Sequence, residues 1–130
     1  MGVQVRFPKK PTVKRRRHHP DSIMDQPLGS CFLCWRLEGN GMPAAEGLER
    51  HHIYDGPNRM ISEENGFTVR LCRRHHRNGP AAVHRNIKAM RYLQEACQRA
   101  YEKDHTRDEF MALIGRNYLE GEHERTDQTP

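Results

Sequence analysis

The stretch Leu71-Cys-Arg-Arg-His-His76 decides the fold, because it places three metal-binding side chains directly after a short apolar segment. Within it, Cys72 and His75 are spaced so that both can bind one ion, and Cys31-Phe-Leu-Cys34 supplies a second pair with the same spacing. Structural zinc ions in small domains are bound by four such donors in a tetrahedron. The sequence therefore predicts a structural Zn²⁺ bound by Cys31, Cys34, Cys72 and His75.

The composition also favours a domain that a metal ion stabilises. The chain has 130 residues, of which 35% are hydrophobic and 30% charged, so its apolar core is small. Domains of this kind often depend on a metal ion or on disulfides. The alternative is that Cys31 and Cys34 are a buried or redox-active pair, but the βαβ pattern around thioredoxin-like motifs is not visible here. The fourth cysteine, Cys97, lies on the apolar face of a predicted helix and is expected in the core.

Within the Cys/His motifs at 31–34, 51–53 and 72–76, three histidines remain once zinc has its four donors, namely His51, His52 and His76. His51 and His52 are adjacent on a predicted strand, so their side chains point to opposite faces and suit different roles. One can bind a divalent ion, which polarises a phosphoryl oxygen, and the other can deprotonate water. Together these groups can hydrolyse a phosphodiester. The alternative is that one histidine packs in the core and the other is solvated.

The apolar pattern predicts an α+β domain built on a β-hairpin. Strands are expected at 48–54 and 67–71, with Phe67, Val69 and Leu71 on one face and an irregular connection at 59–66. Residues 31–35 are expected to form a tight zinc knuckle, followed by a loop. The hairpin would then deliver Cys72 to the zinc site.

Helices are expected after the hairpin. Residues 73–78 fit one helical turn that Gly79-Pro80 ends, and residues 81–103 have apolar positions at helical spacing. Those apolar positions are Val83, Ile87, Met90, Leu93, Cys97 and Tyr101. Thr106 and Glu109 match a capping box for a last helix that ends at Gly115. We divide the chain into a flexible basic arm (1–28), a zinc-bound domain with C-terminal helices (29–119) and a polar tail (120–130).

Positive charge is concentrated in two places. The net charge is +5, and residues 1–20 hold seven of the 22 basic residues and no acidic residue. A second basic cluster overlaps the end of the Cys/His motif, with no Asp or Glu between positions 70 and 94. This distribution favours a nucleic acid as partner, and the alternative is a solubilising tail with a solvated helix face. The residues expected to contact DNA are Arg15, Arg16, Arg17, Arg73, Arg74 and Arg77.

In order along the chain, Cys-x-x-Cys, His51-His-Ile53 and Leu71-Cys-x-x-His-His76 resemble the motif of HNH nucleases in its zinc-stapled form. The resemblance implies a ββα-metal fold, in which a hairpin and a helix bind one catalytic divalent ion. It also implies that His51 and His76 are metal ligands, that His52 is the general base, and that His75 replaces the last zinc cysteine. The C-terminal regions are similar to a small, prophage-encoded branch of the family.

Two positions depart from the HNH pattern. Phe67 stands where the family has an asparagine that orients the base, and Asn65 is the nearest substitute. Gly79-Pro80 interrupts the helix where the last metal ligand is expected, so His84 becomes the candidate ligand, with Asn86 behind it. The alternative for His84 is a surface position on the long helix.

These features lead to the expectation of a metal-dependent DNA endonuclease or nickase of HNH type, with structural Zn²⁺ and with Mg²⁺ or another divalent metal as catalytic ion. The alternative is a non-catalytic, degenerate HNH zinc module that binds DNA or a phage or host protein, as a phage accessory protein or inhibitor would. An RNA-binding knuckle is less favoured, because 7% aromatic residues provide few stacking surfaces. The sequence shows no signal peptide and no apolar run that could cross a membrane, so a cytoplasmic location is expected.

Overall fold

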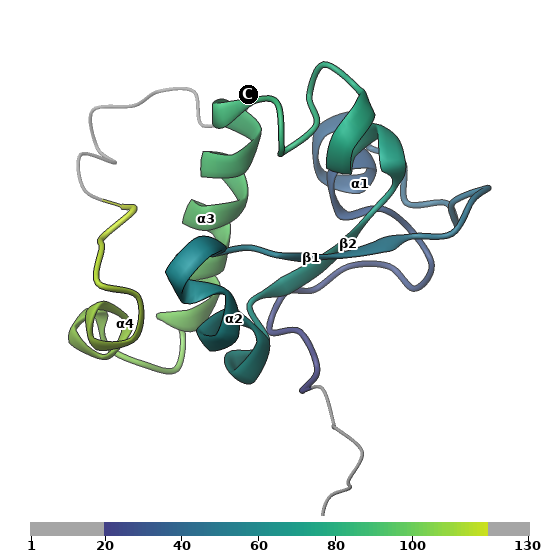
Figure 1. The fold of residues 1–130 in the computed structure, drawn as a ribbon. Coiled ribbons are helices and arrows are strands. Elements are labelled where there is room, and N and C mark those ends of the chain that lie inside the picture. The colour runs from purple at the N-terminus through teal and green to yellow at the C-terminus, as the bar shows by residue number, and fades with distance from the viewer. Residues whose placement is uncertain (1–19, 120–130) are drawn as a thin grey trace, which may run out of the picture.

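Two antiparallel strands organise the domain, as the computed structural model of residues 20–119 shows (Figure 1). Strand β1 (Glu49–His52) pairs with strand β2 (Thr68–Leu71), with His51 opposite Val69 and His52 opposite Thr68. Phe67, Val69 and Leu71 are at most 1% exposed, which confirms the predicted apolar face. The chain is therefore an α+β domain with a two-stranded sheet and helices around it, as expected.

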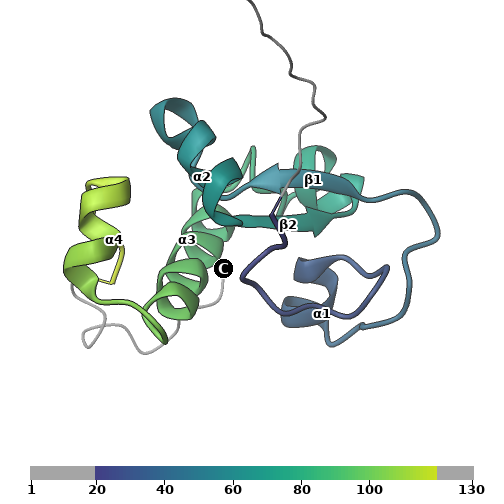
Figure 2. The same ribbon diagram turned by 90° about the horizontal axis from the view of Figure 1, so that it is seen from below.

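Helix α1 (Phe32–Glu38) lies at one end of the hairpin, and helices α3 (Ile87–Tyr101) and α4 (Arg107–Ile114) lie toward the other end (Figure 2). The predicted knuckle at 31–35 is the first turn of α1. Cys31 caps this helix, because its sulfur accepts a hydrogen bond from the backbone N–H of Cys34 at 3.4 Å. Phe32 and Leu33 are buried, so α1 is fixed by packing as well as by its cap.

The connection between the strands is helical, and the prediction of an irregular segment at 59–66 is wrong. A 3-10 turn, η2 (Gly56–Asn58), leads into helix α2 (Arg59–Asn65). The buried Ser62 hydroxyl donates to the carbonyl of Tyr54 at 2.6 Å and accepts from the Tyr54 N–H at 3.1 Å. This exchange ties α2 to the chain that leaves β1.

After β2, the π-helix η3 (Arg74–Asn78) makes the single turn that was predicted, and Gly79 ends it. The N–H groups of His75 and His76 both donate to the carbonyl of Cys72, at 3.1 and 2.9 Å. The Gly79 N–H donates to the Arg74 carbonyl at 2.8 Å. Single π-turns of this kind are frequent at functional sites.

Helix α3 (Ile87–Tyr101) begins later than predicted, because Asn86 caps it. The Asn86 side-chain oxygen accepts from the N–H groups of Lys88 and Ala89 at 2.9 and 3.2 Å. Ile87 was predicted on the buried face but is 66% exposed, since it opens the first turn. The fully buried positions of α3 include Ala89, Leu93 and Cys97, and the expectation that Cys97 lies in the core is confirmed.

Helix α4 (Arg107–Ile114) has the predicted capping box between Thr106 and Glu109, and Gly115 follows it with a φ of 86°. Its Phe110 packs against Tyr54 and Phe67, with ring centroids 5.6 and 6.3 Å apart. These rings form an aromatic core at the end of the hairpin opposite the four zinc-ligand candidates.

Residues 22–26, which were expected to belong to a flexible arm, lie against β2 instead. Ser22 donates to the carbonyl of Thr68, and the Gln26 side chain bonds both the N–H and the carbonyl of Arg70. Met24 is 8% exposed. The backbone groups at this edge of β2 need partners, and the segment provides them. The rest of the predicted arm, residues 1–19, and the predicted tail lie outside the described residues.

Within residues 20–119, none of the helices combines the length and the apolar character that crossing a membrane requires.

Candidate metal sites

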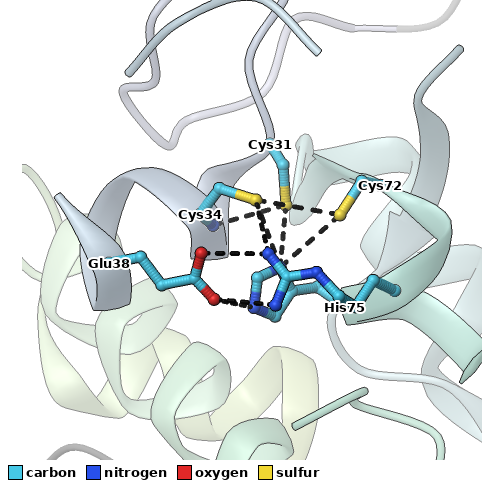
Figure 3. Close-up of polar contacts among 6 residues, drawn as sticks. Cys31, Cys34, Glu38, Cys72 and His75 are labelled. Carbon is cyan, nitrogen blue, oxygen red and sulfur yellow. Dashed lines mark hydrogen bonds and ion pairs between the residues drawn. The ribbon is translucent and has the colours of Figure 1, made fainter. Parts of the chain in front are cut away.

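The four side chains predicted to bind zinc converge in the structure (Figure 3). The Nδ1 atom of His75 lies 3.5 Å from the sulfur of Cys31, 3.4 Å from that of Cys34 and 3.5 Å from that of Cys72. The sulfurs of Cys34 and Cys72 are 3.8 Å apart. A tetrahedral zinc ion requires about 3.8 Å between two sulfurs and about 3.5 Å between sulfur and nitrogen, given bonds of about 2.3 and 2.0–2.1 Å. The four donors therefore have the spacing that zinc needs.

A carboxylate completes the surroundings of this site. Glu38, at the end of α1, lies 3.2 Å from Nε2 of His75, on the far side of the ring from the sulfurs (Figure 3). Arg74 holds Glu38 with two hydrogen bonds, at 2.8 and 2.9 Å. Because the carboxylate accepts a hydrogen bond from Nε2–H, the lone pair of Nδ1 is left directed at the metal position. Histidines that bind metals are commonly oriented in this way.

Burial shapes the protonation of these donors. It raises the pKa of Cys31, and it raises the pKa of Cys34 to about 12. Burial also lowers the pKa of His75, with the nearby Arg74 charge acting in the same direction. Without a cation the thiols of Cys31 and Cys34 stay protonated and His75 stays neutral, so binding a metal releases protons.

A second cluster is formed by His51, His76 and His84, whose ligand atoms all lie within 4.8 Å of one another. The Nε2 atoms of His76 and His84 are 3.1 Å apart. Two nitrogens bound to one ion at about 2.0–2.1 Å lie about 2.8–3.0 Å apart in octahedral geometry and about 3.3–3.4 Å apart in tetrahedral geometry. Nε2 of His51 is buried and has no hydrogen-bond partner among the described residues. An orphaned nitrogen of this kind is what a metal ligand presents before its ion binds.

Backbone contacts, not a continued helix, bring His84 to this cluster. The N–H of Val83 donates to the carbonyl of His75 at 2.8 Å, and the N–H of His84 donates to that of His76 at 3.3 Å. These bonds fold residues 81–86 back onto η3. Asn86 does not support His84, because its side chain caps α3 and donates to the carbonyl of Pro80.

His51 remains neutral at physiological pH. Burial lowers its pKa to about 3, and the neighbouring histidines His76 and His84 add to this effect. Burial also lowers the pKa of His84, followed by the effect of His76. Neutral imidazoles are the form that binds metals. The cluster is therefore prepared for a cation without first losing protons from these two rings.

His52 lies beside the cluster, although its side chain leaves β1 on the other face. A pocket of about 180 Å³ contains all four histidines. Its remaining lining residues are Arg50, Asp55, Arg59 and Arg77. One pocket thus combines three candidate metal ligands, a candidate base and three cations. The positions Arg50 and Arg59 were not identified from the sequence.

Each of three histidines has its own carboxylate. Besides Glu38 on His75, Glu49 accepts from Nδ1 of His76 at 2.6 Å and Glu63 bonds Nε2 of His52 at 2.7 Å. Sequence reasoning missed all three acids. Only Glu49 had a usable signal, because it stands two positions before His51 on the same strand and shares its face.

The arginines predicted to contact DNA lie in different surroundings in the structure. Arg77 lines the histidine pocket, whereas Arg74 is engaged by Glu38 at the zinc site. Arg73 is exposed, and Arg15, Arg16 and Arg17 lie outside the described residues. Phe67 is fully buried in the aromatic core, and the Asn65 amide donates to the carbonyl of Ile61 within α2. Neither residue reaches His52 in the manner expected of the HNH asparagine.

Comparison with known proteins yields no match, whether against family models, curated proteins or solved structures.

Proposed function

We propose that this protein is a metal-dependent nuclease of HNH type that hydrolyses phosphodiester bonds in DNA. The observation that carries the proposal is the histidine pocket, where three converging histidines and a carboxylate-bound His52 share one space with three arginines. Strand β1 and the turn η3 supply most of these side chains, and β2 pairs with β1 and leads into η3. This order of elements supports the ββα-metal arrangement that the sequence motif implies.

The donor set supports a transition metal as the catalytic ion. Three imidazole nitrogens suit ions such as Zn²⁺, Ni²⁺ or Co²⁺, whereas Mg²⁺ prefers carboxylate and water oxygens. An ion bound by His51, His76 and His84 would polarise the phosphoryl oxygen and stabilise the leaving oxygen. Glu49 orients His76 toward that position through its 2.6 Å hydrogen bond.

In the proposed reaction, His52 accepts a proton from a water molecule. The water oxygen then forms a bond to phosphorus, and the bond between phosphorus and the leaving oxygen breaks. Arg50, Arg59 and Arg77 line the same pocket and would neutralise the phosphate. Because these contacts involve phosphate and not bases, the pocket itself would show little sequence preference.

The hairpin offers a further reason to expect a polyanion. Arg50 and Arg70 are directly opposite each other on β1 and β2. Glu63 already pairs with Arg50 at 3.3 Å, whereas Arg70 is exposed, so this part of the hairpin still presents positive charge to an anion. Both arginines line a second pocket of about 320 Å³ that begins at Pro20, where the basic segment 1–19 joins the domain. A DNA backbone crossing the hairpin would meet both pockets.

The test is cleavage of supercoiled plasmid in the presence of a series of divalent ions. We expect nicking by the wild type and a loss of roughly 10²–10⁴-fold in rate for His52→Ala, the range typical of a general base. His105→Ala is the matched control, since His105 is exposed and stacks on Tyr101 away from the pocket. A wild type that keeps its zinc, binds the second ion and still leaves the plasmid intact contradicts the proposal.

One observation favours the alternative of a non-catalytic module that binds DNA or a protein. Phe67 is fully buried, so the position that should orient the base carries no polar group. The same experiment separates the two functions, because a binding module would shift the plasmid in a gel without nicking it.

A further inference from the structure

We infer that Glu63 is a positioning residue that fixes the ring of His52 for proton transfer, an inference that rests on the nuclease function proposed above. Glu63 comes from α2, the helix that the sequence did not predict. Its Oε1 atom lies 2.7 Å from Nε2 of His52. The two side chains are 20% and 15% exposed, so the contact is largely shielded from water.

The chemistry of the contact fixes the tautomer. An ionised carboxylate can only accept hydrogen bonds, so Nε2 of a neutral His52 must carry the proton. The unprotonated nitrogen is then Nδ1, which is the atom left to take a proton from water. A histidine without such a partner exchanges between two tautomers, of which only one presents a base at Nδ1.

Arg50 holds the carboxylate in place. Its Nη2 atom lies 3.3 and 3.5 Å from the two oxygens of Glu63. Arg50 and His52 are two positions apart on β1, so their side chains leave the strand on the same face. The strand therefore presents both partners to one acid of α2, and the three residues form a chain of contacts from Arg50 through Glu63 to His52.

The informative substitution is Glu63→Gln, which keeps the size of the side chain. A glutamine amide can donate to Nε2 as well as accept from it, so it permits the tautomer that has its proton on Nδ1. Glu64→Gln is the matched control, because Glu64 is the next residue of α2, is exposed and loses the same charge. Thermal unfolding and zinc content verify that both variants fold.

We expect Glu63→Gln to lower kcat for DNA cleavage by roughly 10- to 100-fold, within the contribution of a positioned base. The KM should stay within about twofold of the wild type and Glu64→Gln should cleave normally, because the acid acts through His52 and not on DNA. If Glu63→Gln cleaves as fast as Glu64→Gln, or gains activity because a negative charge near DNA has gone, the inference is overturned.

A second measurement does not depend on cleavage. Nitrogen-15 NMR of the histidine rings reports which nitrogen of His52 carries the proton. We expect Nε2–H in the wild type and a mixture in Glu63→Gln. If the wild type does not cleave, the nuclease proposal fails, but a fixed Nε2–H that the variant releases still establishes the positioning contact. A mixed tautomer in the wild type overturns the inference whether or not DNA is cleaved.

Discussion

Adjacent histidines in this protein serve different sites. In η3, Nδ1 of His75 faces the three zinc-site sulfurs, while Nε2 of His76 faces His84. In β1, His51 belongs to the metal cluster and His52 to the contact with Glu63. Alternation along a strand explains the second pair. The first pair depends on the π-turn, whose two leading N–H groups both bond the carbonyl of Cys72.

The substitution His84→Ala tests the metal cluster formed by His51, His76 and His84. The change leaves only His51 and His76 as donors, so we expect affinity for a second ion to fall by at least about tenfold. His84 is exposed, and its removal should alter the free energy of unfolding by no more than about 0.5 kcal/mol. Isothermal titration of zinc-loaded protein with Co²⁺ measures the affinity, with His105→Ala as control. Wild-type affinity in His84→Ala would show that His84 is only a surface histidine.

The donors of both sites could be predicted from the sequence, but their partners could not. Cysteine and histidine types at fixed spacing are enough to identify Cys72 and His75 as zinc ligands. Glu38, Glu49 and Glu63 come from three separate segments, and each reaches its histidine only after α1, β1 and α2 are placed. Acids are common in this chain, so no spacing rule distinguishes Glu38 or Glu63 among its 17 Asp and Glu residues, and only Glu49 had a signal, its place two positions before His51.

Among the elements, those with a local signal were predicted and those fixed by tertiary contacts were not. The capping box of α4 and the alternating apolar residues of β2 can each be recognised from a few consecutive residues. Helix α2 has no such pattern, because its Met60 is exposed and its main anchor is the hydroxyl of Ser62 on Tyr54. Residues 81–86 have helical spacing, yet bonds from Val83 and His84 to η3 override it.

A substitution at Gly66 tests how the end of α2 packs against residues 21–23. Gly66 ends the helix with a φ of 73°, and a side chain there would collide with the backbone carbonyl of Asp21. We expect Gly66→Ala to lower the free energy of unfolding by about 2–4 kcal/mol, since strain and overpacking each cost about 1–3 kcal/mol. Gly39→Ala is the matched control, because Gly39 has a φ of 71° but no neighbour within 4 Å. It should cost only about 1 kcal/mol.

Urea denaturation of both variants provides the comparison. Equal losses for Gly66→Ala and Gly39→Ala would mean that residues 21–23 do not pack over Gly66 as the hydrogen bond from Ile23 to its carbonyl indicates.

In the molecule as a whole, the hairpin links two different sources of stability. β2 begins after Phe67, in the aromatic core, and ends before Cys72, in the zinc site. The aromatic end is held by packing among Tyr54, Phe67 and Phe110. At the other end Phe32 and Leu33 of α1 are buried, and metal binding there would add to this packing. The histidine pocket adjoins the zinc site, because His76 follows His75 directly.

This arrangement predicts a one-way dependence between the two metal sites. Cys31 lies in the zinc site and contributes nothing to the histidine pocket. We expect Cys31→Ser to abolish the Co²⁺–thiolate absorption band. We also expect it to lower the affinity of the histidine pocket for the second ion by about 10–100-fold, the usual effect of disturbing the support of a metal ligand. The reason is that η3 holds both His75 and His76, so losing the zinc releases His76 as well.

The converse should not hold, because emptying the histidine pocket leaves all four zinc donors in place. His84→Ala should therefore keep the full thiolate band. Cys97→Ala is the control for Cys31→Ser, since it removes a buried thiol from α3 without touching either site and should retain both ions. If Cys31→Ser loses the thiolate band but binds the second ion with wild-type affinity, η3 is held by its backbone bonds to Cys72 and Val83, and zinc supports only α1.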